Sequence, residues 1–237
     1  MWLNRVKKFF LDLFFPKNCL GCNLPDIYLC RDCFNKIQII ENNICFFCGK
    51  ITWQGKICFD CRKENGLDRI ISATEYKNPL TRDLIKAFKY HYVKELAKPL
   101  SQLLIKSLEC LNFGLWNNLD FILIPIPLYG ARMRYRGFNQ AELLAKEVAD
   151  YFKLPLENSI LKRIVSTEPQ AKFGEDYEKR KENIKNVFEI KQAELIKDKN
   201  IILIDDVATT GATLVEAAKI LKNNEAKEVW GLVVAKG

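Results

Sequence analysis

The chain of 237 residues has a single histidine, His91, and no run of 18 uncharged apolar residues. The missing apolar run argues against a membrane-spanning helix. The first residues, MWLNRVKKFFLDLFF, are basic and apolar, but Asp12 interrupts them and no small-residue cleavage site follows, so they make a poor signal peptide. We therefore expect a cytoplasmic protein that is not transmembrane. His91 lies in a polar stretch, where we expect an exposed turn without a catalytic role.

Internal repeats and low-complexity linkers are also absent, as are the nucleotide-binding patterns GxxxxGK[ST] and GxGxxG. The absence of the two patterns disfavours an ATPase and a Rossmann dinucleotide site. With 49% hydrophobic and 28% charged residues, the chain is too hydrophobic for a disordered protein and too charged for a membrane protein. The formal net charge of +8 favours anionic partners such as phosphates, nucleic acid or an acidic membrane surface.

Cysteine is scarce over most of the chain, because eight of the nine lie within 19–61 and only Cys110 lies outside. The eight form four CxxC pairs, Cys19/Cys22, Cys30/Cys33, Cys45/Cys48 and Cys58/Cys61. Two such pairs can surround one tetrahedral ion, so the four pairs predict two closed, structural zinc sites. If neighbouring CxxC pairs share an ion, the connectors between them are 7 and 9 residues long; if alternate pairs share an ion, the connectors are 22 and 24 residues long. We favour the first, sequential pairing, because its short connectors allow a small hairpin. Metal-free reduced pairs or redox CxxC motifs are the alternative.

From Asp68 onward, apolar runs alternate with amphipathic segments. The expected strands are 69–76, 121–127, 201–204 and 229–235, and the expected helices are 80–90, 93–108, 139–152 and 212–221. Strands separated by helices indicate an α/β fold with a parallel sheet. We divide the chain into an amphipathic N-terminal helix (1–15), a zinc-binding module (16–65) whose folding is coupled to metal binding, and an α/β domain (66–237).

The segment IILIDDVATTGAT (201–213) has the pattern of a phosphate site, with an apolar strand running into Asp205 and Asp206, a Thr/Gly loop and a helix. Ligands of such sheets bind beyond the carboxyl ends of the strands, and a helix N-terminus after a glycine-containing loop offers N–H groups to a phosphate. The predicted phosphate-binding residues are Ala208, Thr209, Thr210, Gly211, Ala212 and Thr213. Carboxylates accept hydrogen bonds from ribose hydroxyls, so the segment predicts a site for a sugar with a 5′-phosphate. An acidic strand end followed by an ordinary helix cap is the alternative.

This segment resembles the phosphoribosyl pyrophosphate (PRPP) signature of type I phosphoribosyltransferases. RYRGFNQAELLA (134–145), PQAKFGEDYEKRKENIKNVF (169–188), LIKAFKY (84–90) and the four CxxC pairs resemble elements of the ComF family of competence proteins. The resemblance implies a type I phosphoribosyltransferase-like core with a parallel sheet, preceded by a double zinc ribbon. It also implies a role in competence and DNA uptake, with single-stranded DNA and an uptake helicase as partners.

The resemblance further implies site residues. The catalytic ones are Asp205, Asp206, Arg136 and Arg180. The loop 128–137 would lie where pyrophosphate binds together with magnesium, and a flap over 167–177 would exclude water. The residues implied at the pyrophosphate and in the flap are Arg132, Arg134, Gln170 and Lys172. Solvated surface loops are the alternative interpretation of the arginines and the flap.

Two segments alternate cations with aromatic side chains, KAFKYHYVK (86–94) and RMRYRGF (132–138). Such surfaces suit single-stranded nucleic acid, because bases stack on the rings. The candidates are Lys86, Lys89, Tyr90 and Tyr92; the alternative is that half of these aromatic residues belong to the core. Two functions therefore stay open. One is PRPP binding in DNA uptake and single-strand handling, and the other is an active phosphoribosyltransferase of nucleotide salvage or biosynthesis with an unknown acceptor.

Overall fold

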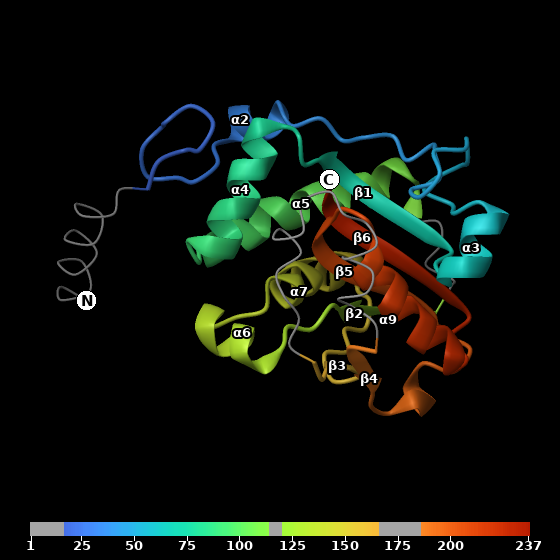
Figure 1. Cartoon of the computed structure of the whole chain (residues 1–237). Helices are drawn as coiled ribbons and strands as arrows, with labels where there is room; N and C mark the ends of the chain where they lie inside the picture. Colours follow the sequence, from blue (N-terminus) through green and yellow to red (C-terminus); the bar gives the residue numbers. More distant parts are fainter. Residues whose placement is uncertain (1–16, 114–119, 166–185) are drawn as a thin grey trace.

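The computed structural model describes residues 17–113, 120–165 and 186–237 (Figure 1). Its centre is a sheet in the order β1-β6-β5-β2, in which all neighbours are parallel. The strands are β1 (Arg69–Glu75), β2 (Phe121–Pro125), β5 (Asn200–Ala208) and β6 (Glu228–Lys236). A separate antiparallel ribbon pairs β3 (Leu161–Arg163) with β4 (Phe188–Ile190). The predicted α/β fold with a parallel sheet is confirmed.

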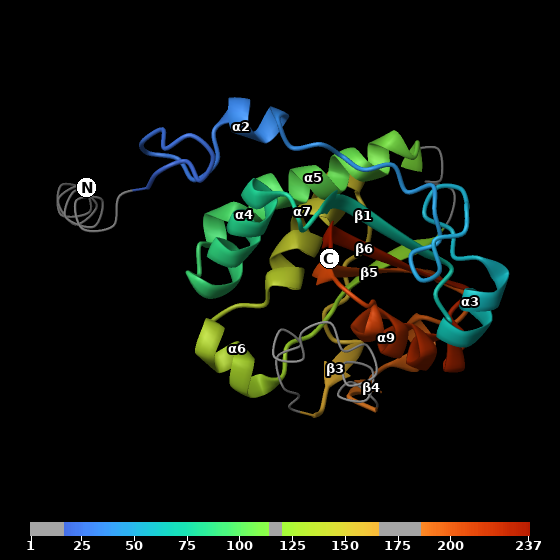
Figure 2. The ribbon, with the colours of Figure 1, turned by 45° about the horizontal axis from the view of Figure 1, so that its top comes forward.

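Helices cover both faces of the sheet, as Figure 2 shows. The helices α5 (Ala97–Cys110) and α7 (Gln140–Phe152) pack on one face, and α9 (Ala212–Asn223) packs on the other. The central strands β5 and β6 are buried along most of their length, which explains the apolar runs 201–204 and 229–235. The other helical elements among the described residues are α2 (Arg31–Asn35), α3 (Phe59–Asn65), α4 (Pro79–Tyr90), η1 (Lys94–Leu96), α6 (Gly130–Arg136) and η4 (Ala193–Leu195).

The cysteine-rich stretch wraps around the edge strand β1 and joins the core on both faces. Three of its first four cysteines, Cys19, Cys30 and Cys33, belong to the hydrophobic cluster that contains α4 and α5, whereas Cys45 belongs to the cluster that contains α9. The backbone N–H of Ile40, between the two groups of cysteines, donates to Ala73 O at 3.0 Å. The N–H of Ile70 donates to O of Gly55, between Cys48 and Cys58, at 2.9 Å. These bonds cover an edge that would otherwise offer unpaired backbone groups.

Two of the differences from the sequence-based expectation lie close to the predicted ligand site. The strand β5 continues to Ala208 instead of ending at 204, because β6 supplies parallel partners as far as Lys236. The carboxylates of Asp205 and Asp206 therefore lie within the strand. The segment 128–137, expected as a loop, contains α6, which ends at Gly137 in a left-handed conformation (φ 72°) that favours glycine.

Some predicted features lie outside the described residues. These are the N-terminal helix 1–15 and the flap 167–177, together with Arg180. The flap sequence connects β3 to β4, so both of its attachment points are described. His91 directly follows α4 and is exposed, as expected. Across the described ranges, none of the helices has both the length and the hydropathy needed to span a bilayer.

Candidate functional site

The eight clustered cysteines form two groups of four. The first group is Cys19, Cys22, Cys30 and Cys33, and the second is Cys45, Cys48, Cys58 and Cys61. Within each group, the sulfur atoms all lie within 4.8 Å of one another. The sequential pairing is therefore confirmed, and four cysteine sulfurs around one point provide the donor set of a closed, tetrahedral zinc site. We call these groups the first and second zinc sites.

One thiol in each zinc site has a lowered pKa, which favours the thiolate form that binds a metal. Burial raises the pKa of the Cys19 thiol, but backbone N–H hydrogen bonds outweigh this effect and lower it to about 6. The same balance lowers the pKa of Cys45 to about 7. Burial and the neighbouring thiols raise the pKa of Cys33 to about 12, so zinc has to displace a proton there. Zinc affinity is therefore expected to fall as the pH falls.

The two acidic residues of β5 occupy the carboxyl end of the central strand. Asp206 is buried, and its Oδ1 lies 2.7 Å from Nζ of Lys89 on α4. The backbone N–H of Asp206 donates to Oδ1 of Asp205 at 2.8 Å. Lys89 follows the buried Ile85 by one helical turn and so faces the sheet. This placement differs from the expectation that Lys89 belongs to a nucleic-acid surface, because its side chain is engaged with Asp206.

The two carboxylates have different electrostatic environments. Burial raises the pKa of Asp205 to about 7, and the charge of Asp206 adds to this effect against the opposing influence of Lys89 and Arg163. Burial lowers the pKa of Lys89, but the charges of Asp206 and Asp205 outweigh it and raise the pKa. At neutral pH, the site therefore offers an ion-paired carboxylate beside one that gains and loses a proton. Both can hydrogen-bond to the hydroxyls of a sugar.

The predicted phosphate loop connects β5 to the N-terminus of α9. Gly211 caps the helix with a φ of 74°, a conformation that favours glycine. The hydroxyl of Thr210 accepts a hydrogen bond from Ala212 N at 3.3 Å, and the hydroxyl of Thr209 is buried with no hydrogen-bond partner among the described residues. A helix N-terminus next to an unused hydroxyl is suited to an anionic ligand.

Arg163 of β3 lies near Asp205 and near Arg132 of α6. Burial lowers the pKa of Arg163, as does the charge of Arg132, whereas Asp205 opposes them. Arg163 therefore lies within electrostatic range of both Arg132 and Asp205. Arg163 also lines a pocket of about 300 Å³, whose other lining residues are Tyr129, Gly130, Ala131, Arg134, Lys162 and Ile164. Sequence analysis missed Arg163, although a cation just before the predicted flap was an available signal.

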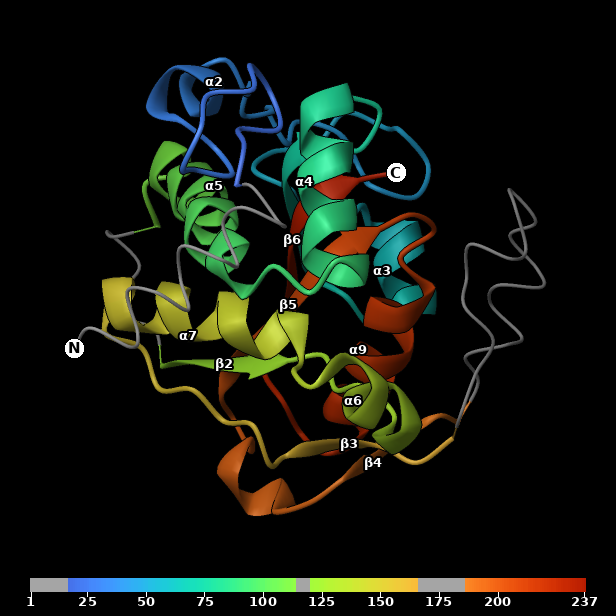
Figure 3. The same cartoon turned by 90° about the vertical axis from the view of Figure 1, so that its left-hand side faces the viewer.

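The two cationic, aromatic segments meet on one surface, where α4 ends beside α6 (Figure 3). The rings of Tyr92 and Tyr135 lie 6.0 Å apart, and the guanidinium of Arg136 lies 5.6 Å from the ring of Tyr90. Tyr90 is 54% exposed, Tyr92 37% and Tyr135 81%. We call these four side chains the tyrosine surface.

The remaining residues of the two segments divide between solvent and core. Lys86 is exposed on α4, whereas Phe88 and Phe138 are buried with their ring centroids 5.7 Å apart. Arg136 also donates to Oε1 of Gln140 at 3.1 Å, which fixes the guanidinium between α4 and α7. The alternative interpretation of the aromatics as core residues thus applies to the phenylalanines and not to the tyrosines.

Comparison with protein families gives two matches. A double zinc ribbon domain matches residues 10–62, and a phosphoribosyl transferase domain matches residues 139–236. The second match contains β5, α9 and the loop between them.

Curated relatives match nearly the whole chain. Competence protein F of Haemophilus influenzae is 31% identical over 231 residues, which cover 94% of this chain and 99% of that protein. Competence protein ComFC of Bacillus subtilis is 30% identical over 206 residues, covering 83% and 79%. The DNA utilization protein YhgH of Salmonella typhimurium is 27% identical over 225 residues, covering 92% and 96%.

Proposed function

This chain belongs to the ComF family of competence proteins, and from that premise we propose that it binds PRPP or a related 5-phosphoribosyl ligand at the junction of β5 and α9. The family combines a double zinc ribbon with a phosphoribosyltransferase domain, and both are present here. The relatives named for competence and for DNA utilization support a role in the uptake and handling of DNA.

The observation that carries the PRPP proposal is the pair of carboxylates placed directly before a glycine-capped helix N-terminus. Asp205 and Asp206 would accept hydrogen bonds from the ribose hydroxyls. The amides and hydroxyls of 209–213 would hold the 5′-phosphate, and the buried, unused hydroxyl of Thr209 supports this assignment. The ion pair between Lys89 and Asp206 keeps the second carboxylate in place before the ligand arrives.

The cations near Asp205 would bind the pyrophosphate part of the ligand. Arg163 lies close enough to Asp205 and to Arg132 for their charges to affect its pKa, and Arg134 lines the same pocket as Arg163. PRPP would enter as its magnesium complex, with the metal as part of the substrate. If the ligand reacts, the cations would stabilise the departing pyrophosphate while the carboxylates favour positive charge on the ribose. Gln170, Lys172 and Arg180 are proposed to complete the site from the flap.

Thermal unfolding with and without ligand tests PRPP binding. Millimolar PRPP with magnesium is expected to raise the midpoint by roughly 5–10 °C, because a ligand at about 100 times its Kd adds about 2.7 kcal/mol. Replacing both acidic residues, Asp205→Asn with Asp206→Asn, is expected to abolish the shift measured against the variant's own ligand-free midpoint. Asp83→Asn, an exposed aspartate on α4, serves as the matched control and should keep the shift. An unchanged wild-type midpoint, or a full shift in the double variant, would contradict the proposal.

We further propose that single-stranded DNA binds across the tyrosine surface. Three exposed tyrosines and Arg136 lie together there, although they come from two segments far apart in the sequence. Each ring offers a face on which a base can stack, and the guanidinium attracts the backbone phosphates. Lys86, exposed earlier on α4, would add to this attraction.

Substitution of the exposed tyrosines tests DNA binding. Tyr90→Ala and Tyr135→Ala are each expected to weaken binding of a single-stranded oligonucleotide by roughly tenfold, because a stacked base contributes about 1–3 kcal/mol. Tyr151→Ala is the matched control, since Tyr151 lies near the far end of α7 and is as exposed as Tyr90, at 54%. Fluorescence anisotropy at several salt concentrations measures both affinity and its salt dependence. Equal losses at Tyr151 and Tyr90, or binding insensitive to salt, would rule out this surface.

A further inference from the structure

Two phenylalanines of the second zinc site border the phosphate loop. Phe46 and Phe47 lie between Cys45 and Cys48, and their rings meet edge to face at 5.4 Å. A Cβ atom at Gly211 would lie 3.1 Å from Cε1 of Phe47 and 3.2 Å from Cε1 of Phe46. The two rings therefore close one side of the loop at the residue that has to keep a positive φ.

Phe46 also positions a cation at the end of the neighbouring strand. The Nζ atom of Lys236 lies 4.9 Å from the centre of the Phe46 ring. In the sheet register, Lys236 is the partner of Ala208, the last residue of β5 before the phosphate loop. The turn between Cys45 and Cys48 thus contacts both the glycine of the loop and the lysine beside it.

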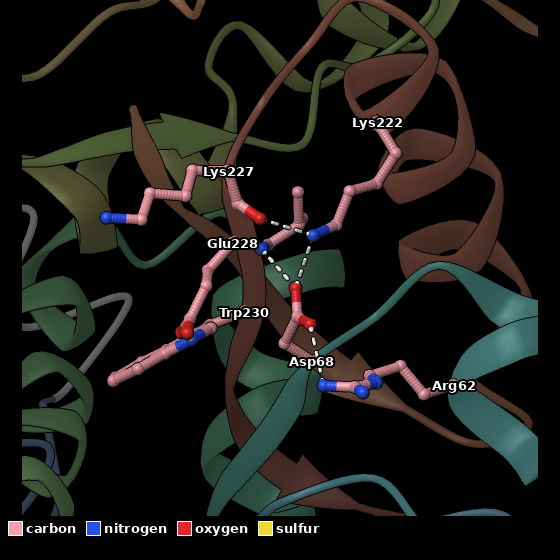
Figure 4. A network of polar contacts seen from close by, with 7 residues as sticks. Arg62, Asp68, Lys222, Lys227, Glu228 and Trp230 are labelled. Carbon is pink, nitrogen blue, oxygen red and sulfur yellow. Dashed lines mark hydrogen bonds and ion pairs between the residues drawn. The ribbon is translucent and has the colours of Figure 1, made fainter. Parts of the chain in front are cut away.

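The same zinc site is connected to the other end of α9 (Figure 4). Arg62, next to the ligand Cys61, lies 3.6 Å from Oδ1 of Asp68. The other oxygen of Asp68 lies 2.7 Å from Nζ of Lys222, in the last turn of α9, and accepts from the N–H of Val229 at 2.8 Å. The helix that presents the phosphate loop is therefore attached at both ends to segments of the second zinc site.

The first zinc site has a different neighbour. A Cβ atom at Gly21, in its first CxxC turn, would lie 3.3 Å from Leu80, at the start of α4. Its buried cysteines belong to the hydrophobic cluster that contains α4 and α5, whereas α9 packs in the other cluster. The two sites share ligand chemistry but support opposite faces of the sheet.

We infer that the second zinc site positions the phosphate loop through Phe46 and Phe47, so that affinity for a 5′-phosphate depends on this site and not on the first. The inference rests on the proposed PRPP function. Its physical basis is that the two rings restrain the backbone of Gly211. A loop that also adopts other conformations binds its ligand only in the fraction of molecules that hold the binding conformation, so its apparent affinity is lower. An apolar wall on one side also keeps water away from the loop amides and so strengthens their hydrogen bonds to an anion.

A matched pair of cysteine variants in the full chain tests the inference. Cys48→Ser in the second site and Cys22→Ser in the first both replace an exposed second cysteine of a CxxC pair. Each variant is expected to keep the zinc ion of its intact site, as metal analysis can verify. In isothermal titration with ribose 5-phosphate, Cys48→Ser is expected to bind roughly tenfold more weakly than wild type, and Cys22→Ser to bind like wild type.

Variants of Phe47 leave all eight clustered cysteines in place. They therefore distinguish an effect on the position of the phosphate loop from a general loss of stability. Phe47→Ala is expected to weaken ribose 5-phosphate binding by roughly five- to tenfold, and Phe47→Leu to restore most of it. Binding of inorganic pyrophosphate, which would use Arg132 and Arg163, is expected to stay unchanged in both variants.

Hydrogen exchange of the amides of 209–213 in the ligand-free protein gives a readout that needs no ligand. Exchange is expected to be faster in Cys48→Ser and Phe47→Ala, and unchanged in Cys22→Ser. Equal effects of Cys22→Ser and Cys48→Ser, or unaltered exchange in Phe47→Ala, would overturn the inference. If wild type binds neither PRPP nor ribose 5-phosphate, the proposed function fails, while the exchange rates still decide whether the zinc site positions the loop.

Discussion

Removal of zinc by a chelator is expected to unfold residues 17–66 and to lower the midpoint of thermal unfolding of the remainder by roughly 10 °C or more. In isolated zinc-finger peptides, a structural zinc ion contributes roughly 10–16 kcal/mol, which is comparable to the entire stability of a typical domain. The effect should spread beyond the cysteines. Their buried side chains belong to the two hydrophobic clusters of the sheet, and the connecting segment covers the edge of β1.

Calorimetry with and without chelator, combined with measurement of released zinc, checks this prediction. Two zinc ions per chain are expected. Cys110→Ser is the matched control, because Cys110 is exposed and lies outside both zinc sites, so the variant should unfold like wild type. A chelated protein with an unchanged midpoint would show that the zinc ions are not structural.

Opposite changes in stability are expected from neutralising the two adjacent aspartates in the absence of ligand. Asp206→Asn leaves the ammonium of Lys89, 21% exposed, without its closest partner, and should lower the free energy of unfolding by about 2–3 kcal/mol. The nearby carboxylate of Asp205 takes over part of the pairing and limits the loss. Asp205→Asn removes a charge that burial and Asp206 disfavour, and should raise the free energy of unfolding at pH 8 by about 2–4 kcal/mol.

The gain from Asp205→Asn should depend on pH in a defined direction. The pKa of Asp205 is about 7 in the folded protein, above its usual value of about 3.9 when unfolded. Between these values, the folded state binds more protons, so wild-type stability falls as the pH rises from about 4 to about 7. The advantage of the variant should therefore be absent near pH 4, grow through this window and stay constant above it.

Urea unfolding from pH 4 to pH 8 measures both effects. Lys86→Met, an exposed lysine one turn before Lys89 on α4, should change stability by less than about 0.5 kcal/mol, whereas Lys89→Met should not be neutral. Equal effects of the two aspartate substitutions at pH 8 would show that the carboxylates share one environment.

Much of the fold could be predicted from the sequence, because its signals are local. The CxxC spacing, the unbroken apolar strands and the TTGAT turn before a helix each involve residues close together in the chain. The short ribbon of β3 and β4 was missed, since three residues per strand carry no detectable alternation. The helix α6 was expected to be a loop because its arginine-rich sequence has no apolar face, and none of its residues is buried.

The sequence by itself determined the parallel α/β core, two four-cysteine zinc sites and the position of the two carboxylates before the glycine-containing loop. Only the tertiary structure decided which distant residues join them. In the folded protein, Lys89 forms an ion pair with Asp206, and Arg163 lies within electrostatic range of Asp205. The ring of Tyr92 contacts that of Tyr135, and the rings of Phe46 and Phe47 border Gly211. The physical reason is that the local sequence does not show whether a cation or an aromatic ring faces water or packs against another segment of the chain. The packing of the helices and the zinc sites on the sheet determines which of these side chains are buried and which are exposed.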